Sequence, residues 1–361
     1  MRFAFVTTDL TVGGAQTWLI NTSRLLLDQG HEVHIFLYSE IIRVDLDARV
    51  NLHFLSFGRK VWGNRLSKII ASFRLLNKIR KLGPFNLIIS TLPFADQITH
   101  TSRVGPSCFR IANNLSNEID ALNGPKGKRR MRRYMKLYSG KKIISVSEGV
   151  KNDLVKNFGF EIENITTIYN PIDKERLREL ADKYEPFIKE PYLLHSGRFA
   201  FQKRHDILLD AFKQYLMQSK LDDPKKLVLI CESSQKLEKM IKKRKLDEAV
   251  IVAGFHENPF PWYKNSSCIV LSSDREGMPN ILLEGLALGV PIASTDCPSG
   301  PNEILGDRYS DFLAPTGDPK QLALSILKAL HSREAIPESI LDPFLPSETL
   351  RKINDLCKEV D

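Results

Sequence analysis

Residues 274–291 read Asp-Arg-Glu-Gly-Met-Pro-Asn-Ile-Leu-Leu-Glu-Gly-Leu-Ala-Leu-Gly-Val-Pro. The surrounding pattern predicts a strand over 268–272, a tight turn, a helix, and a second strand over 290–294. Pro279 suits the first helical position, and Gly289 suits the end of the helix. The stretch therefore predicts a strand-helix-strand unit of an open α/β sheet, where ligands bind at the C-terminal ends of strands.

Two glutamates stand out in this unit, Glu276 in the turn and Glu284 in the middle of the helix. The neighbours of Glu284 are mostly leucines, and a carboxylate in apolar surroundings is costly unless something donates hydrogen bonds to it. Vicinal ribose hydroxyls would do so. The alternative is that Glu284 is a surface residue on an amphipathic helix, because single charged residues are common there.

Length and charge suggest two unlike halves. The chain has 361 residues, enough for two domains, and 42% of them are hydrophobic. Lys and Arg outnumber Asp and Glu by 25 to 13 in residues 1–172, whereas the numbers are 27 and 30 in the rest. Only the first half is therefore expected to meet a polyanion or an anionic surface.

Strands and helices alternate along both halves, which predicts parallel sheets flanked by helices. The alternation restarts after the turn-like element 170–173, where we place a linker. We expect an N-terminal domain over 1–172, a C-terminal domain over 173–342, and a final helix in 343–361 that packs back on the first domain. The fold class is α/β, with two doubly wound domains facing one another across a cleft.

The ends of the chain and its cysteines bear on localisation. Met1–Val6 has the pattern of a strand, not of a signal peptide, and no apolar run approaches the length that spans a bilayer. The five cysteines form no paired pattern, which fits a reducing compartment. We expect a soluble, cytoplasmic protein.

Two loops have the composition of anion-binding turns. Gly13 and Gly14 follow the first strand and precede a helix, so the backbone can approach a ligand at a helix N-terminus. Arg198 follows the strand 192–196, and Lys203 comes five residues later. Together they could hold a diphosphate. Alternatively, the first loop is a tight connection and the second a solvated basic loop.

Metal ligands are not expected. Asp45 and Asp47 form an Asp-x-Asp pair in a polar stretch without a glycine turn or a further ligand nearby, so we interpret them as surface residues. The histidines show no metal-binding spacing.

Residues 126–142 carry the strongest concentration of positive charge and no acidic residue. If this segment is helical, Met131, Tyr134, Met135 and Tyr138 form one apolar stripe beside a cationic face. That pattern suits an anionic membrane surface or a lipid-phosphate acceptor. The stripe suits the core of a domain equally well. No nucleic-acid-binding signature accompanies the charge, so we expect no nucleic acid partner.

The ordered set of motifs resembles the retaining GT-B glycosyltransferases of family 4 over nearly the whole chain. The Glu-x7-Glu pattern of Glu276 and Glu284 is fairly specific on its own. The other matching segments are Gly13–Gln16, Gln29–Val33, Val146–Val150, Asn170–Asp173, Ser196–Arg198, Gly254–Phe255 with Asn258–Pro259, and Ser294–Pro301. The last of these looks like bacterial O-antigen, capsule and exopolysaccharide transferases.

The resemblance implies a role for each candidate residue. Arg198 and Lys203 would neutralise the donor diphosphate in place of a metal, and Glu276 would orient the donor sugar. Glu284 would hold the ribose, and the Gly13–Gly14 loop would close on the diphosphate. The stretch with Phe255 and His256 would meet the base. Backbone groups near the sugar would come from Gly277, Met278, Pro279 and Asn280, of which only Pro279 lacks an amide hydrogen. Catalysis would consist of positioning and charge stabilisation, without a protein nucleophile.

Two departures from the family pattern concern donor and acceptor contacts. Many relatives have a histidine after a strand of the first domain, where this chain has Asn113 and Asn114. Either asparagine would hydrogen-bond donor or acceptor, but neither can act as a base. Relatives also often have a Gly-x-Gly turn where this chain has 231–234.

We therefore predict a retaining, metal-independent hexosyltransferase. It would move a hexose or N-acetylhexosamine from a nucleotide diphosphate sugar, with UDP favoured over GDP. The acceptor would be a polyprenyl-diphosphate- or lipid-linked glycan of bacterial surface polysaccharide synthesis, reached from the inner face of the plasma membrane. The alternatives are a nucleotide-sugar-binding module without transfer activity and a nucleotide-sugar epimerase of similar fold.

Overall fold

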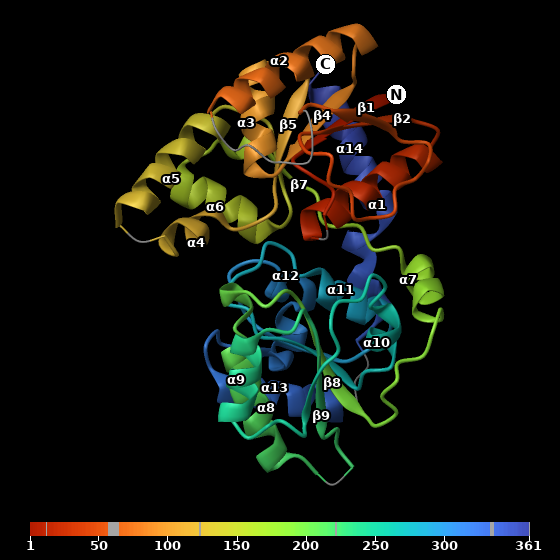
Figure 1. Ribbon diagram of the computed structural model, residues 1–361, viewed down its shortest axis with the longest axis vertical. Helices are drawn as coiled ribbons and strands as arrows, with labels where there is room; N and C mark the ends of the chain where they lie inside the picture. The colour runs from red at the N-terminus through yellow and green to blue at the C-terminus, as the bar shows by residue number, and fades with distance from the viewer. Residues whose placement is uncertain (12, 57–64, 123, 221, 333–335, 361) are drawn as a thin grey trace. The chain divides into compact units, whose positions relative to one another are not determined.

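The protein divides into two compact units (Figure 1). The computed structural model describes residues 1–361 except 12, 57–64, 123, 221, 333–335 and 361. Unit 1 consists of Met1–Pro171 together with Phe344–Asp361, and unit 2 of Ile172–Pro343. These limits differ by a single residue from the domain limits expected from the sequence.

Unit 1 is built on a seven-stranded parallel sheet in the order β3-β2-β1-β4-β5-β6-β7. Its strands are β1 (Arg2–Thr7), β2 (Glu32–Leu37), β3 (Asn51–Phe54), β4 (Leu87–Thr91), β5 (Ser107–Ile111), β6 (Ile143–Ser145) and β7 (Ile165–Thr167). Its helices are α1 (Gly14–Asp28), α2 (Arg65–Leu82), α3 (Pro93–Ser102), α4 (Leu115–Asp120), α5 (Gly124–Tyr138), α6 (Glu148–Phe158), the short 3-10 helix η1 (Ile162–Asn164) and α14 (Pro346–Val360). The strand order reverses between β1 and β4.

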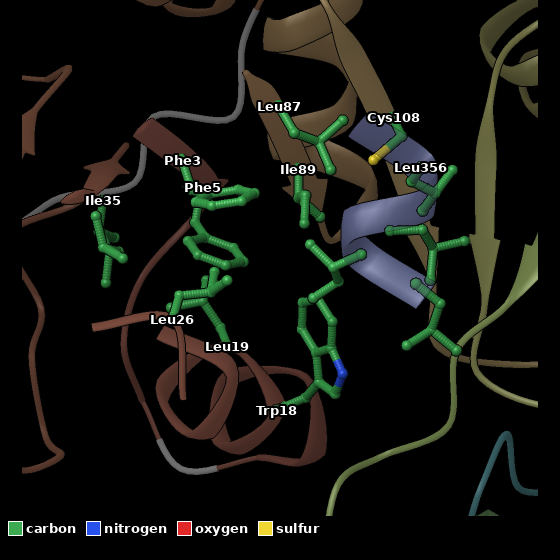
Figure 2. Packing of buried hydrophobic residues seen from close by; sticks show 14 of the residues in the cluster. Phe3, Phe5, Trp18, Leu19, Leu26, Ile35, Leu87, Ile89, Cys108 and Leu356 are labelled. Atoms are coloured by element: carbon green, nitrogen blue, oxygen red, sulfur yellow. The ribbon is translucent and has the colours of Figure 1, made fainter. Parts of the chain in front are cut away.

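The two faces of this sheet are covered by different helices, because successive side chains of a strand point to opposite sides. In β1, Phe3 and Phe5 pack with α1 and α14, whereas Ala4 and Val6 pack with α2 and α3. Figure 2 shows the first of these clusters, in which the two phenylalanine rings lie against side chains of α1. Leu356 of α14 belongs to the same cluster, so the last helix completes the core of the unit in which the chain begins.

Unit 2 repeats the architecture with six parallel strands in the order β10-β9-β8-β11-β12-β13. The strands are β8 (Tyr192–Ser196), β9 (Lys226–Ile230), β10 (Val250–Val252), β11 (Cys268–Leu271), β12 (Ile292–Thr295) and β13 (Leu313–Ala314). The helices are α7 (Lys174–Ala181), α8 (His205–Gln218), α9 (Gln235–Lys243), α10 (Phe260–Lys264), α11 (Asn280–Ala287), α12 (Pro301–Leu305), α13 (Pro319–His331) and the 3-10 helices η2 (Phe201–Lys203), η3 (Asp307–Phe312) and η4 (Glu338–Phe344). Its strand order reverses between β8 and β11.

The predicted α/β class and the doubly wound parallel sheets are confirmed. One local prediction was wrong: Pro279 is the N-cap of α11 and the helix begins at Asn280. The backbone of Pro279 is extended, with ψ 96°, so the turn that carries Glu276 runs one residue further than expected. Within the described residues, no helix combines the length and the apolar character needed to cross a membrane.

Candidate functional site

The C-terminal ends of β8 and β11 form the switch point of unit 2. Two neighbouring strands there send their following loops to opposite sides, which leaves a crevice at the edge of the sheet. The loop after β8 carries Arg198 and Lys203, and the loop after β11 carries Glu276. The fold thus brings the two predicted charge clusters of this half to one place.

Lys203 and Glu276 are in direct contact. Lys203 Nζ lies 2.7 Å from Glu276 Oε1, and the side chains are only 17% and 11% exposed. Ser273 Oγ donates a second hydrogen bond, 2.6 Å long, to the same carboxylate oxygen. The cation and the carboxylate that the sequence assigns to a donor therefore form an ion pair with one another.

Arg204 ties the two loops together behind this pair. Its Nη1 reaches both oxygens of Asp274 at 2.9 and 2.8 Å, while Nε and Nη2 bind Asp206. The backbone of Arg204 is left-handed, with φ 47°, which is uncommon for a residue other than glycine. Two further bonds join the loops, from Ser272 Oγ to the carbonyl of Lys203 and from the Asp274 amide to the carbonyl of Gln202. Lys203 is therefore held rigidly beside the turn of Glu276.

Two glycines lie close to their neighbours around the pair. A Cβ added to Gly197 would lie 3.3 Å from Lys203 Cε, so the lysine chain crosses the glycine closely. Gly300, in the loop after β12, has φ 97°, and an added Cβ would come within 2.4 Å of Pro279 Cδ. The loop after β12 thus packs directly on the turn formed by Gly277, Met278 and Pro279.

Glu284 lies on α11 and is partly buried, as the apolar sequence around it predicts. Burial raises the pKa of its carboxyl to about 7. The described part of the structure offers its carboxylate no hydrogen-bond donor. Gly285 lets α11 lie close on the sheet, because a Cβ there would be 2.7 Å from Ile269. Glu284 is thus less exposed than the surface alternative expects, but it is not fully buried.

The remaining residues predicted for unit 2 are less constrained. Arg198 is exposed and forms no ion pair with the residues that the structure describes. Phe255 is 50% exposed in the loop after β10, and His256 Nε2 lies 3.1 Å from the carbonyl of Ala253. This loop follows β10, which is separated from β8 by β9, and no described contact links it to Lys203 or Glu276.

In unit 1 the switch point lies beside β1, where the chain turns into α1. Gly13 is the N-cap of α1, with an extended backbone, and Gly14 is the first residue of the helix. A Cβ added to Gly14 would have no neighbour within 4 Å, so the space above this helix start is open within the unit. A Cβ added to Gly13 would lie 2.8 Å from Gln16 Oε1, so Gly13 has a steric reason within its own turn, whereas the described residues give none for Gly14.

Asn113 and Asn114 have different tasks in the loop after β5. Asn114 is buried and caps α4, because its Oδ1 accepts hydrogen bonds from the Asn117 amide and from Ser116 Oγ. Asn113 is exposed and donates only a 3.2 Å bond to Glu118. Asn113 is thus the asparagine whose side chain is accessible to a ligand.

The basic segment 126–142 contains α5, and its apolar stripe faces the core. Tyr134 and Tyr138 are buried, and the Tyr138 hydroxyl donates to the buried carboxylate of Asp96 over 2.7 Å. Met131 and Met135 are partly buried. The core-facing alternative is therefore correct, and the stripe is not free for a membrane. The exposed residues of α5 include Lys126, Lys128, Arg129, Arg132, Arg133 and Lys136.

Asp47, of the Asp-x-Asp pair, is engaged by Arg49, whose Nη2 lies 2.6 Å from the carboxylate. The exposed Arg49 guanidinium also binds Asp28. This arrangement agrees with the interpretation of the pair as surface residues.

Sequence reasoning missed three residues that shape the site, namely Ser273, Arg204 and Asp274. Each lies within three positions of a predicted residue, so proximity in sequence was the available signal. The run Lys203-Arg204-His205-Asp206 places an acid two positions after an arginine, which indicates local pairing, but it does not reveal Asp274, 70 positions away. His195 was also missed. It is fully buried beneath Gly197, and its Nδ1 binds the carbonyl of Val270.

Comparison with known proteins identifies the chain. Residues 12–176 match the family described as Glycosyltransferase Family 4, and residues 178–339 match the family described as Glycosyl transferases group 1. The chain belongs to the GT-B glycosyltransferases. The two matches correspond to the two units, so this glycosyltransferase carries both halves of the fold.

Its relatives include glycosyltransferases of surface glycan synthesis. An uncharacterized glycosyltransferase of Methanocaldococcus jannaschii is 28% identical over 82% of this chain and 76% of its own length. The Campylobacter jejuni N-acetylgalactosamine-N,N'-diacetylbacillosaminyl-diphospho-undecaprenol 4-alpha-N-acetylgalactosaminyltransferase is 32% identical over 46% of this chain and 44% of its own length. Anabaena HepE, solved with UDP and glucose, superimposes with a TM-score of 0.73 at 15% identity, covering 99% of this chain and 100% of that chain.

Proposed function

We propose that this glycosyltransferase moves a hexose or N-acetylhexosamine from a UDP-sugar to a lipid-linked glycan, with retention of configuration. The observation that carries the proposal is the pairing of Lys203 with Glu276 at the switch point of unit 2. A partly buried cation and a partly buried carboxylate that meet at the C-terminal edge of a parallel sheet suit a ligand with one anionic and one hydroxyl-rich end.

In this proposal the donor replaces the internal ion pair. The donor diphosphate forms an ion pair with Lys203 in place of Glu276. Arg198 adds a bidentate contact to the diphosphate from the exposed side of the loop. Glu276, still held by Ser273, accepts hydrogen bonds from sugar hydroxyls. Two cations beside the diphosphate offset the charge that develops as the diphosphate leaves, so we propose that no metal ion is needed.

The remaining donor contacts follow from the same arrangement. Glu284 receives the ribose hydroxyls, which supply the hydrogen bonds that its carboxylate lacks within the described structure. Phe255 and His256 meet the base, and the backbone of Gly277, Met278, Pro279 and Asn280 borders the sugar. In unit 1, we propose that Gly13, Gly14 and Asn113 contribute to substrate binding, the glycines through their backbone and Asn113 through a neutral hydrogen bond.

A lipid-linked acceptor is supported by charge and by the relatives. The Campylobacter jejuni enzyme is named for a diphospho-undecaprenol substrate, and an Escherichia coli relative is named a lipopolysaccharide 1,6-galactosyltransferase. The exposed cations of α5 would attract an anionic membrane surface, where such an acceptor resides. We therefore propose peripheral attachment at the inner face of the plasma membrane.

Donor choice is tested by thermal shift across UDP- and GDP-sugars, because a ligand that binds only the folded state raises the apparent melting temperature. We expect UDP-sugars to raise it in the absence of divalent metal. Transfer is tested with Glu276→Ala. Product formation by this variant equal to wild type would overturn the assignment of the site. If the wild-type protein binds donor but transfers nothing to any lipid-linked glycan, the rival interpretation as a binding module gains the support instead.

A further inference from the structure

Helix α2 has an apolar face that the fold leaves uncovered. Leu66 and Phe73 are each 65% exposed, and Ile69 and Ile70 are 44% and 45% exposed. Their spacing of three, four and seven positions places all four on one side of the helix. Single exposed apolar residues are ordinary, but a contiguous group of large ones usually marks a contact surface.

The opposite face of α2 fixes the orientation of this surface. Ala71, Leu75 and Ile79 are buried in the core cluster of unit 1 that lies between α2, α3 and the sheet. The helix cannot rotate to hide the other face without removing these residues from the core. The surface of Leu66, Ile69, Ile70 and Phe73 is therefore directed away from the sheet.

Charge narrows the choice of partner. Helix α2 contains no acidic residue, and it carries six cations, which are Arg65, Lys68, Arg74, Lys78, Arg80 and Lys81. The pKa of Lys68 is lowered by burial and then by the nearby charges of Arg133 on α5 and of Arg65. The basic residues of α2 and α5 thus lie close enough to share one electrostatic field. Figure 1 shows α2, α3 and α5 on the same side of the sheet of unit 1.

We propose that the apolar face of α2 inserts into the interfacial layer of an anionic bilayer, with the cations of α2 and α5 on the lipid headgroups. An apolar stripe flanked by Lys and Arg is the pattern of helices that lie in the plane of a membrane surface. This assignment deepens the proposed function, since it names the element that holds the enzyme beside a lipid-linked acceptor. Membrane attachment would then use two helices. Helix α2 supplies the apolar surface together with cations, whereas α5 supplies cations alone, because its apolar stripe is buried in the core.

A second copy of this chain is the main rival for the surface. A symmetric dimer through α2 would place the same patch on both partners, so two strongly basic helices would face one another. Like charges across an interface oppose association, whereas a layer of anionic lipid headgroups would attract the same basic helix. Charge complementarity therefore favours the membrane.

The test measures partition of the full chain onto vesicles, with neither donor nor acceptor present. In the double variant Leu66→Gln and Phe73→Gln, glutamine keeps the helix propensity while it removes the apolar surface. We expect partition onto phosphatidylcholine–phosphatidylglycerol vesicles to fall by about one to two orders of magnitude. The matched control is Met217→Gln on α8 of unit 2, where the replaced side chain is 68% exposed, and it should bind as wild type does. Equal binding by the double variant and the wild type would overturn the proposal.

A second arm reports insertion directly. The tryptophan introduced by Phe73→Trp should be quenched by lipids brominated in their acyl chains, whereas one introduced by Met217→Trp should not. Charge reversal with Arg129→Glu and Arg132→Glu should weaken binding to anionic vesicles by roughly tenfold and leave the weak binding to neutral vesicles unchanged. If the double glutamine variant instead converts a dimer to a monomer while vesicle binding persists, the surface joins two copies and the proposal fails. UDP-induced thermal shifts of the same variants tell a failure of membrane binding apart from a failure of the donor site.

Discussion

The C-terminal edges of the two sheets have the same topology and opposite chemistry. Both sheets reverse their strand order beside the first strand of the unit, at β1 and β4 in unit 1 and at β8 and β11 in unit 2. The edge of unit 2 carries charge, with Lys203 on Glu276 and Arg204 on Asp274. At the edge of unit 1, the residues that we assign to substrate are Gly13, Gly14 and Asn113, which are all uncharged.

Arg43 lies exposed near the edge of unit 1, where its amide binds the carbonyl of Leu10, but another cation there is buried away from solvent. Arg110, next to the end of β5, is 2% exposed, and its guanidinium carbon lies 4.1 Å from the ring centroid of Trp18. Its Nη2 binds Asn170, and desolvation lowers the pKa of the guanidinium to about 9. A shared scaffold therefore does not dictate where charge is used. Among the residues that we assign to substrate, charge belongs to unit 2 and neutral hydrogen bonding belongs to unit 1.

The strongest test of this division removes the cation of unit 2. Lys203→Met should lower kcat/KM by about 10²- to 10³-fold, the usual effect of losing a preorganised group that stabilises developing charge. The affinity for free UDP should fall as well. Glu276→Gln should also lose activity, but its UDP affinity should stay equal or rise, because Lys203 is released from its internal partner. Titration calorimetry with UDP distinguishes the two effects.

Arg110→Met is the matched control from unit 1. Two nitrogens of the buried Arg110 guanidinium, Nε and Nη1, have no hydrogen-bond partner among the described residues, so an apolar residue of similar size removes a desolvation cost. UDP affinity should therefore be unchanged. A loss of UDP affinity as large as that of Lys203→Met would contradict the difference that we infer between the edges of the two sheets.

The next largest effect is expected at Arg204. Arg204→Met should reduce kcat about tenfold or more and also raise the KM for donor, since the loop of Lys203 loses its bidentate contact with Asp274. Arg204→Lys should recover only part of the loss, because an ammonium group cannot bind two carboxylates as a fork does. Arg244→Met, which breaks a similar pair with Asp210 in the same unit, should leave both constants unchanged. Steady-state kinetics at varied donor concentration gives the answer, and equal effects at both arginines would refute a positioning role.

Glu284 predicts a pH dependence of stability and of donor binding that originates in unit 2. Burial raises the pKa of its carboxyl from 4.5 to about 7, so the stability that favours the neutral acid is fully present below 4.5 and is lost as pH rises through 7. Glu284→Gln should therefore stabilise the ligand-free protein above pH 7, by an amount on the order of 2 kcal/mol. Donor binding to the carboxylate should release a proton near pH 6.5 and weaken by up to about tenfold per unit below that. Calorimetry in two buffers of different ionisation enthalpy detects this proton. A pH profile that the substitution leaves unaltered would exclude the ribose role.

The smallest effects belong to the asparagines of unit 1. Asn114→Ala should lower the free energy of unfolding by about 1 kcal/mol through loss of the cap of α4. Asn113→Ala should leave the melting temperature unchanged and lower kcat/KM about three- to tenfold, as for one neutral hydrogen bond. Thermal denaturation combined with kinetics tests both. The opposite outcome, with Asn113 stabilising and Asn114 affecting only kinetics, would reverse our assignment.

The alternation of strands and helices was predictable because each strand is a short apolar run bounded by turn residues. The predicted limits 192–196 coincide with β8. The residues that meet at the edge of unit 2 were also predictable, since parallel strands bring the loops that follow them to one side. The bond from Arg204 to Asp274 was not, because sequence shows charges but not which of them pair over 70 positions.

The two basic helices show a second limit. Periodicity predicts that a helix has an apolar face, but it does not tell whether that face is turned inward. In α5 it is turned inward, with Tyr134 and Tyr138 in the core. In α2, Leu66 and Phe73 lie opposite the buried residues, so apolar side chains on both faces obscure any single stripe. Whether the apolar face of a helix is buried or exposed therefore becomes clear only from how the helix packs on the sheet.

The discontinuous make-up of unit 1 has a consequence for how the molecule is made. Phe344–Asp361 joins Met1–Pro171 in one compact unit, and Ile353, Leu356 and Cys357 are part of its core. On the ribosome, unit 2 is therefore complete before the first sheet receives its last covering helix. The apolar surface of β1 and β4 that α14 covers therefore stays exposed until the whole of Ile172–Pro343 has been synthesised. The time needed to synthesise the second unit thus sets how long the core of unit 1 remains without α14.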